Sequence, residues 1–138
     1  MPIPPMWSSC EEGKTCSIVT ISSVGRLTIV QDTWIGHEII ILASADIEIG
    51  AYVNIAPRVY IGTGTHEIDT NGISIAGRGY SLPIIIGNGS WICTCSTIIA
   101  GVKIGKKSII AAGSVVTRDV PDGQLWGGIP AKYIRQLE

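Results

Sequence analysis

Aliphatic residues recur at every sixth position along two stretches of this chain. The longer stretch consists of Ile86, Ile92, Ile98, Ile104, Ile110 and Val116, and the earlier one of Ile49, Ile55 and Ile61. A period of six matches neither the 3.6-residue repeat of an amphipathic helix nor the alternation of a half-buried strand. It predicts a coil in which each hexad supplies one short strand and one corner, with the aliphatic side chain pointing inward.

Two further positions of the hexad fit such a coil. The residue after the aliphatic is usually small, which we expect to let the chain turn, and the fifth position holds Val, Ser or Thr. Three faces make a coil of about eighteen residues that contacts only the coils above and below it. Because coils stack at the strand spacing of about 4.8 Å, every interior backbone group finds a partner.

We therefore predict one all-β domain over residues 1–138, a parallel β-helix of about five coils. The hexads cover residues 49–65 and 86–120, Ile35 and Ile41 keep the period upstream, and residues 16–30 are expected to form the first strands. Residues 66–83 leave the period and contain three glycines and a closing proline, so they predict an irregular loop at one corner. Residues 121–138 form a tail, which we expect to end in a short helix.

Composition excludes several classes of protein. No apolar run approaches the roughly 18 residues of a membrane span, and the first residues lack the basic start and apolar run of a secretory signal. The net charge of −1 argues against a nucleic-acid binder. Cys93 and Cys95 lie inside the repeat, and neither their spacing nor that of Cys10 and Cys16 suits zinc. We expect reduced thiols, no metal and a cytoplasmic protein.

Charge is distributed unevenly along the chain. Residues 93–138 hold six basic and three acidic residues, whereas residues 1–92 hold four basic and eight acidic ones. The C-terminal part therefore favours an anionic ligand.

The hexads resemble those of the hexapeptide-repeat acyltransferases, and this resemblance implies a left-handed winding of the β-helix. The segments "TGTH" and "GYSLPIIIGNGSWI" are similar to those of the galactoside and maltose O-acetyltransferase group. The resemblance implies acetyl-CoA as donor, a histidine general base and a saccharide acceptor. Those enzymes carry a helical N-terminal module, of which we expect no counterpart in this sequence. Short members of this kind resemble acetyltransferases of bacterial polysaccharide biosynthesis, so a polysaccharide precursor is the expected acceptor.

His66 is the histidine that matches the family's general base. It stands where the six-residue period stops, whereas His37 falls at an ordinary corner and is expected to be a solvated turn residue. Transfer of an acetyl group from a thioester to a hydroxyl requires a base to take the hydroxyl proton, and a neutral imidazole does this at cellular pH. No acyl-enzyme is needed. The developing oxyanion would be stabilised by a backbone N–H of a neighbouring coil.

The group that orients His66 stays open at this point. Adjacent side chains on an extended segment point apart, which argues against Glu67 and leaves Asp69 or a backbone carbonyl. Asp69, Arg78 and Tyr80 of the excursion are the candidates for contact with the acceptor.

The resemblance also implies donor-binding positions. These are Trp91, Thr94, Ala112, Thr117, Arg118, Lys132 and Arg135. In the family the donor lies between adjacent subunits, so we expect a homotrimer in which the excursion leans on a neighbour. Lys132 and Arg135 would share one face of the predicted terminal helix and reach one phosphate group.

Other activities on the same fold remain alternatives. They are serine, amino-sugar or xenobiotic acetyltransferases, and a non-enzymatic trimeric scaffold. A zinc enzyme of the γ-carbonic anhydrase type requires three histidines per site, whereas this chain has two.

Overall fold

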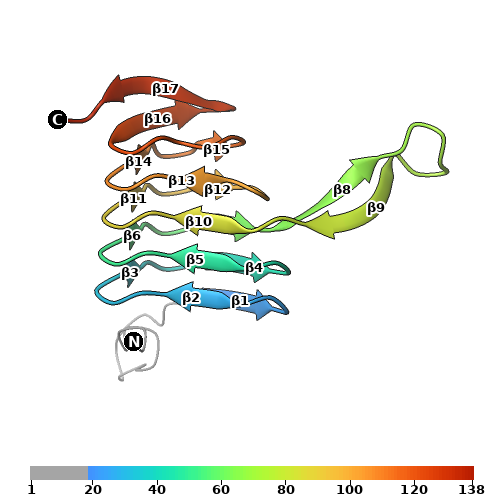
Figure 1. Ribbon diagram of the computed structural model, residues 1–138, viewed down its shortest axis with the longest axis horizontal. Helices are drawn as coiled ribbons and strands as arrows, with labels where there is room; N and C mark the ends of the chain where they lie inside the picture. The colour runs from blue at the N-terminus through green and yellow to red at the C-terminus, as the bar shows by residue number, and fades with distance from the viewer. Residues whose placement is uncertain (1–18) are drawn as a thin grey trace.

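Three parallel sheets form the sides of a solenoid in the computed structural model, which describes residues 19–138 (Figure 1). Sheet A contains β1 (Val19–Ser23), β4 (Ile39–Ala43), β7 (Tyr60–Gly62), β12 (Thr97–Ile98) and β15 (Val115–Val116). Sheet B contains β2 (Leu27–Ile29), β5 (Ile47–Ile49), β10 (Ile84–Ile86) and β13 (Lys103–Ile104). Sheet C contains β3 (Trp34–Ile35), β6 (Asn54–Ile55), β11 (Trp91–Ile92), β14 (Ile109–Ile110), β16 (Gln124–Gly128) and β17 (Ala131–Gln136).

Each coil visits sheets A, B and C in turn, and sheet A contains five strands. The prediction of an all-β solenoid of about five coils is confirmed. Of the expected first strands, β1 and β2 are present, while residues 16–18, Cys10 and Cys16 lie outside the described residues. The described chain contains no helix long and apolar enough to cross a membrane.

The aliphatic of each hexad lies in the core, as the period predicts. On sheet B the side chains of Ile49, Ile86 and Ile104 stand in register on successive strands, and each is at most 1% exposed. On sheet A the equivalent column contains Ile61 and Ile98, which are fully buried. Identical side chains stacked at strand spacing therefore pack against one another along the interior.

The small residue after each aliphatic has a different role from the one predicted. A Cβ built on Gly87 would lie 2.6 Å from the backbone nitrogen of Lys106, so smallness is required by the next coil and not by the turn. The sharp turn comes two residues later, where φ is positive at Asp32, Glu38, Tyr52, Arg58, Gly89, Cys95, Gly101, Lys107 and Gly113. Most of these corners hold a residue other than glycine, for which the left-handed backbone conformation is unfavourable.

Buried hydroxyls at the fifth position satisfy backbone groups of the corners. Ser90 Oγ donates to the carbonyl of Gly105 at 2.7 Å and accepts from the backbone N–H of Ser108 at 3.2 Å. Ser108 Oγ donates to the carbonyl of Pro121 at 2.8 Å. Both serines are 0% exposed, so these bonds join successive coils where water has no access.

Residues 66–83 differ from the predicted irregular loop. The chain leaves sheet A after β7, forms an antiparallel hairpin from β8 (Gly64–Ile68) and β9 (Ala76–Ser81), and returns to sheet B at β10. This hairpin projects away from the solenoid (Figure 1). Its two arms can pair locally because the segment that connects them, 69–75, is short and is closed by a hydrogen bond from the backbone N–H of Asp69 to the carbonyl of Ile75 at 3.0 Å.

The predicted C-terminal helix is wrong. Residues 131–136 form β17, which pairs antiparallel with β16 and extends sheet C, and residues 19–138 contain no helix. The physical reason is that β16 offers an unpaired strand edge, whereas an isolated helix of this length is marginal in water. Gly128, with φ of 103°, makes the turn between the two strands.

Candidate functional site

His66 lies near the base of the hairpin on β8, and its imidazole is exposed. The Nδ1 atom is 2.9 Å from the carbonyl oxygen of Gly77 on the opposite arm. A carbonyl only accepts, so Nδ1 donates a proton in this contact, and in the neutral imidazole Nε2 then keeps its lone pair. Across the hairpin His66 pairs with Gly79, and a Cβ there would lie 3.5 Å from the imidazole. The backbone carbonyl, one of the two groups left open by the sequence, is therefore the one that contacts the ring.

The other polar residues of the hairpin are engaged with one another. Arg78 forms an exposed ion pair with Glu67 at 2.6 Å, across the two arms. Asp69 Oδ1 accepts hydrogen bonds from the backbone nitrogens of Asn71 (3.0 Å) and Gly72 (2.9 Å), which closes the turn at the tip. The carboxylate of Asp69 thus shapes the hairpin.

Tyr80 pairs with Thr65 near the base of the hairpin and is 41% exposed. Its side chain is therefore open to a ligand. Contact of Asp69, Arg78 or Tyr80 with an acceptor stays a prediction.

Five of the predicted donor residues occupy three places on the solenoid. Trp91 is 51% exposed on the outer face of sheet C. Thr94 and Ala112 lie at the corner between sheets C and A, where Thr94 Oγ1 donates to the carbonyl of Pro57 at 2.6 Å. Thr117 and Arg118 lie at the corner between sheets A and B, which is the corner that also carries the hairpin.

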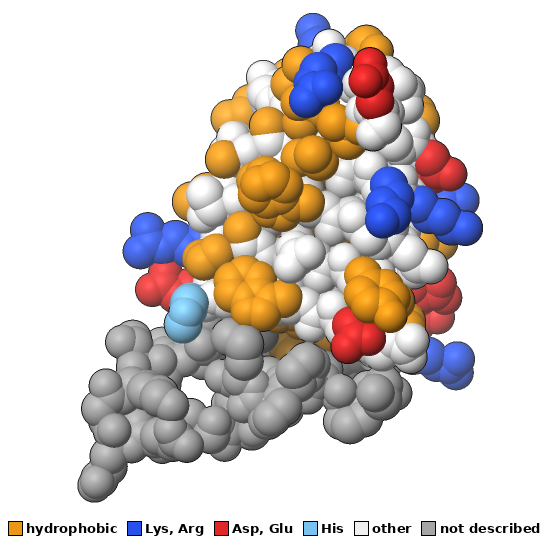
Figure 2. Space-filling view, turned by 90° about the vertical axis from the view of Figure 1, so that its left-hand side faces the viewer, with side chains coloured by type: hydrophobic (Ala, Val, Ile, Leu, Met, Phe, Trp, Pro, Cys, Tyr) orange, Lys and Arg blue, Asp and Glu red, His pale blue; other side chains and the backbone are white. Residues whose placement is uncertain are grey.

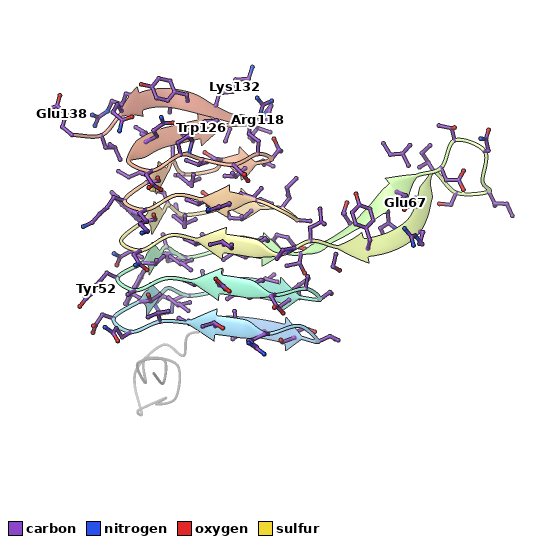
Figure 3. The ribbon with its side chains drawn as sticks, viewed as in Figure 1. Tyr52, Glu67, Arg118, Trp126, Lys132 and Glu138 are labelled. Carbon is purple, nitrogen blue, oxygen red and sulfur yellow. The ribbon has the colours of Figure 1, made fainter. Side chains whose placement is uncertain are left out.

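The two basic residues of the tail lie on β17. They therefore do not share the helix face that the sequence predicted for Lys132 and Arg135. Lys132 pairs with Gly127 and Arg135 with Leu125, with a β-bulge between them. Figure 3 shows Lys132 and Arg118 at the C-terminal end of the solenoid, and Glu67 on the hairpin. The basic residues predicted to bind the donor are therefore gathered at one end.

Several of these residues lie in register on neighbouring strands of sheet C. They belong to one column of side chains, which we call the outer ladder. It consists of Trp34, Asn54, Trp91, Ile109, Leu125 and Arg135 on successive strands. For the first five members the next residue along the strand packs in or against the core, so the ladder side chain points outward, and Arg135 on β17 is exposed. Hydrophobic side chains form a column on this side of the solenoid (Figure 2). Beside the ladder, an open groove of about 690 Å³ is lined by Gly89, Trp91, Lys107, Ser108, Ile109, Gly123, Leu137 and Glu138.

His66 and Trp91 are not brought together within one chain. The hairpin emerges between sheets A and B, and in a three-sided solenoid this corner lies opposite sheet C. The geometry separates the candidate base from the candidate donor face.

The corner between sheets C and A carries two cysteines. Cys93 and Cys95 are both free, and burial raises the pKa of the Cys93 thiol. On the coils below, Arg58 forms an exposed ion pair with Glu38 at 2.6 Å, and this bond raises the pKa of the guanidinium. No cluster of three or more potential metal ligands occurs among residues 19–138.

Comparison with known proteins agrees with this architecture. The family model described as bacterial transferase hexapeptide (six repeats) matches residues 83–118. The galactoside O-acetyltransferase of Escherichia coli K12 is 40% identical over 91 residues, which are 66% of this chain and 44% of that protein. The chain spans about half the length of the curated relatives it matches.

Solved structures extend the similarity. A maltose O-acetyltransferase from Clostridium difficile 630 is 32% identical with a TM-score of 0.66, covering 84% of this chain and 70% of that one. A hexapeptide-repeat acetyltransferase from Vibrio cholerae, complexed with acetyl coenzyme A, is 29% identical with a TM-score of 0.75 and covers 97% and 82%. The chain belongs to the hexapeptide-repeat acetyltransferase family, in the group of the galactoside and maltose O-acetyltransferases.

Proposed function

We propose that this protein transfers the acetyl group of acetyl-CoA to a hydroxyl of a sugar or polysaccharide precursor. The similarity to acetyltransferases of galactosides and maltose, and to one crystallised with acetyl-CoA, supports the reaction class. The observation that carries the mechanism is the hydrogen bond between His66 and Gly77. The left-handed winding implied by the sequence resemblance belongs to the same proposal.

In the proposed mechanism His66 acts as general base. With its proton fixed on Nδ1, the imidazole offers Nε2 to the acceptor hydroxyl and takes its proton as the oxygen attacks the thioester carbonyl carbon. The new C–O bond forms and the C–S bond breaks, and the imidazolium returns the proton to the departing thiolate. The hairpin holds the imidazole by a hydrogen bond to a backbone carbonyl, so the orientation of the ring does not depend on a flexible acidic side chain.

We further propose a homotrimer with sites between subunits. Since His66 and Trp91 lie on opposite sides of one chain, the hairpin of one subunit has to approach sheet C of a neighbour for base and donor to meet. The outer ladder suits an extended donor, because Arg135 lies three strands from Trp91, about 14 Å at strand spacing. Arg135 and Lys132 would contact phosphate, and Trp91 would lie beside the thioester arm. Thr94 and Ala112 would line the cleft from the subunit that supplies Trp91, and Thr117 and Arg118, at the corner that carries the hairpin, would reach it from the neighbouring subunit.

The test is thiol release from acetyl-CoA, measured with maltose, a methyl β-galactoside, a nucleotide sugar, glucosamine, serine and chloramphenicol. The proposal predicts release that depends on a hydroxylated sugar, with the acetyl group found as an ester on the product. Release only with glucosamine, serine or chloramphenicol would favour the alternative acetyltransferases, and no release with any acceptor would favour a scaffold.

A further inference from the structure

Two members of the outer ladder lie beyond the proposed donor site. Trp34 is 37% exposed on β3, and Asn54 lies exposed between Trp34 and Trp91, in register with both. The side-chain amide of Asn54 makes no hydrogen bond to any residue of the described chain. A flat aromatic surface therefore lies beside an amide with two donors and an acceptor available to a ligand.

Trp34 and Asn54 lie where an acceptor would have to bind next to the donor. This inference rests on the proposed function. Direct transfer requires the acceptor hydroxyl to touch the thioester carbon. If Arg135 holds the phosphate end and Trp91 the thioester arm, the ladder continues beyond the reacting end to Asn54 and then Trp34. Trp34 lies two strand spacings from Trp91, about 9.6 Å, which leaves room for a sugar ring between the donor and the end of the ladder.

The chemistry of the pair selects among acceptors. A pyranose has an apolar C–H face and a rim of hydroxyls, so the face can pack on an indole while the rim bonds to an amide. Serine has no such face. An aromatic surface adjoined by a polar amide therefore favours a sugar ring over a small amino acid.

We propose that Trp34 and Asn54 form the acceptor subsite, with a pyranose ring packed on the Trp34 indole and its hydroxyls bonded to the Asn54 amide. In the trimer this subsite faces His66 of the neighbouring subunit. Neither residue stands out in the sequence, because outward positions of a hexad are free to vary without disturbing the core.

Kinetics with a methyl β-galactoside and with maltose test the assignment. Trp34→Ala and Asn54→Ala should each raise the acceptor KM about tenfold or more, equivalent to ~1.4 kcal/mol, with the acetyl-CoA KM within about twofold of wild type. Tyr52→Asn is the matched control, because Tyr52 is an exposed aromatic outside the ladder and asparagine tolerates its φ of 57°. This control should leave both constants unchanged.

A binding measurement separates this subsite from the reaction. Protein labelled with 5-fluorotryptophan should show the Trp34 resonance, assigned with Trp34→Phe, shifting on addition of either sugar without acetyl-CoA. The resonance of the partly buried Trp126 should stay in place.

The outcomes are distinct for the two proposals. Sugar-induced shifts of Trp34 without any acetyl transfer would uphold the subsite and contradict the proposed function. Transfer to sugars with an unchanged acceptor KM in Trp34→Ala and Asn54→Ala would uphold the function and overturn the subsite. A Trp34 resonance that neither sugar moves, in a protein that transfers nothing, would overturn both.

Discussion

His66 gains a defined proton arrangement from a single backbone contact. The carbonyl of Gly77 fixes the Nδ1 proton, and this leaves Nε2 as the only basic atom of the ring. Gly79 across the hairpin leaves the side of the ring open, since it has no side chain to cover it. The residue therefore has what a general base needs, an oriented lone pair in an exposed position.

Replacing His66 should greatly lower the turnover rate and leave the other properties of the protein unchanged. His66→Ala removes an exposed side chain, so the fold, the oligomeric state and the acetyl-CoA affinity should be unchanged. The kcat should fall by about 10²–10⁴, the usual contribution of a positioned base. His37→Ala is the control, at a different corner of the solenoid, and should change kcat by less than about twofold. Near-wild-type turnover in His66→Ala, or loss of folding, would show that the histidine is structural.

At the residue scale, the sequence could locate His66 but not its surroundings. The interruption of the six-residue period marks His66, because the core cannot continue where the chain leaves the coil. The carbonyl of Gly77 carries no sequence signal, as every residue has one. Trp34 and Asn54 were missed for a related reason, because outer positions of short strands face solvent and show no periodic restriction.

At the scale of elements, the hexads predicted strands well and the C-terminal end of the solenoid poorly. Buried columns such as Ile49, Ile86 and Ile104 follow directly from the period. The tail, by contrast, has composition compatible with helix or strand, and the open edge of β16 decides for a strand. The hexads could not predict the hairpin either, because its pairing depends on the register between two arms that lie outside the six-residue period.

Close approach between coils predicts a sharp difference between two glycine substitutions. Gly87→Ala places a Cβ 2.6 Å from a backbone atom of the next coil, so we expect a loss of about 1–3 kcal/mol in the free energy of unfolding. Gly64→Ala is the matched control, since no atom lies within 4 Å of its Cβ position, and should stay within about 0.5 kcal/mol. Guanidinium unfolding at one fixed protein concentration measures both. Equal stabilities would contradict the account of the small position.

At the scale of the whole molecule, the hairpin ends in apolar residues that nothing in the described chain covers. Ile68, Ile73 and Ile75 are 81%, 111% and 63% exposed. Apolar surface of this kind favours burial against another protein, and a neighbouring copy of the chain is the partner that the proposed trimer supplies.

Charges at the tip should therefore break the assembly. We expect the wild type to have the mass of three chains of 14.6 kDa, about 44 kDa, by light scattering. Ile73→Asp with Ile75→Asp should shift this mass toward the monomer and abolish transfer, since burying an unpaired carboxylate is costly. Val24→Asp is the control at an exposed residue (92%) outside the hairpin. A wild-type monomer, or an intact trimer in the double variant, would contradict the proposed packing.

The most direct test of a site shared between subunits is complementation of two inactive variants. His66→Ala lacks the base, and Trp91→Glu places a charge on the donor face. Each alone should be inactive. Co-expressed in equal amounts, they form mixed trimers in which His66 of one subunit can face Trp91 of another, and about one quarter of the sites in a random mixture should be complete. Recovery of about that share of wild-type thiol release is the predicted result. No recovery, in mixed trimers that assemble normally, would show that the base and the donor face do not meet across subunits.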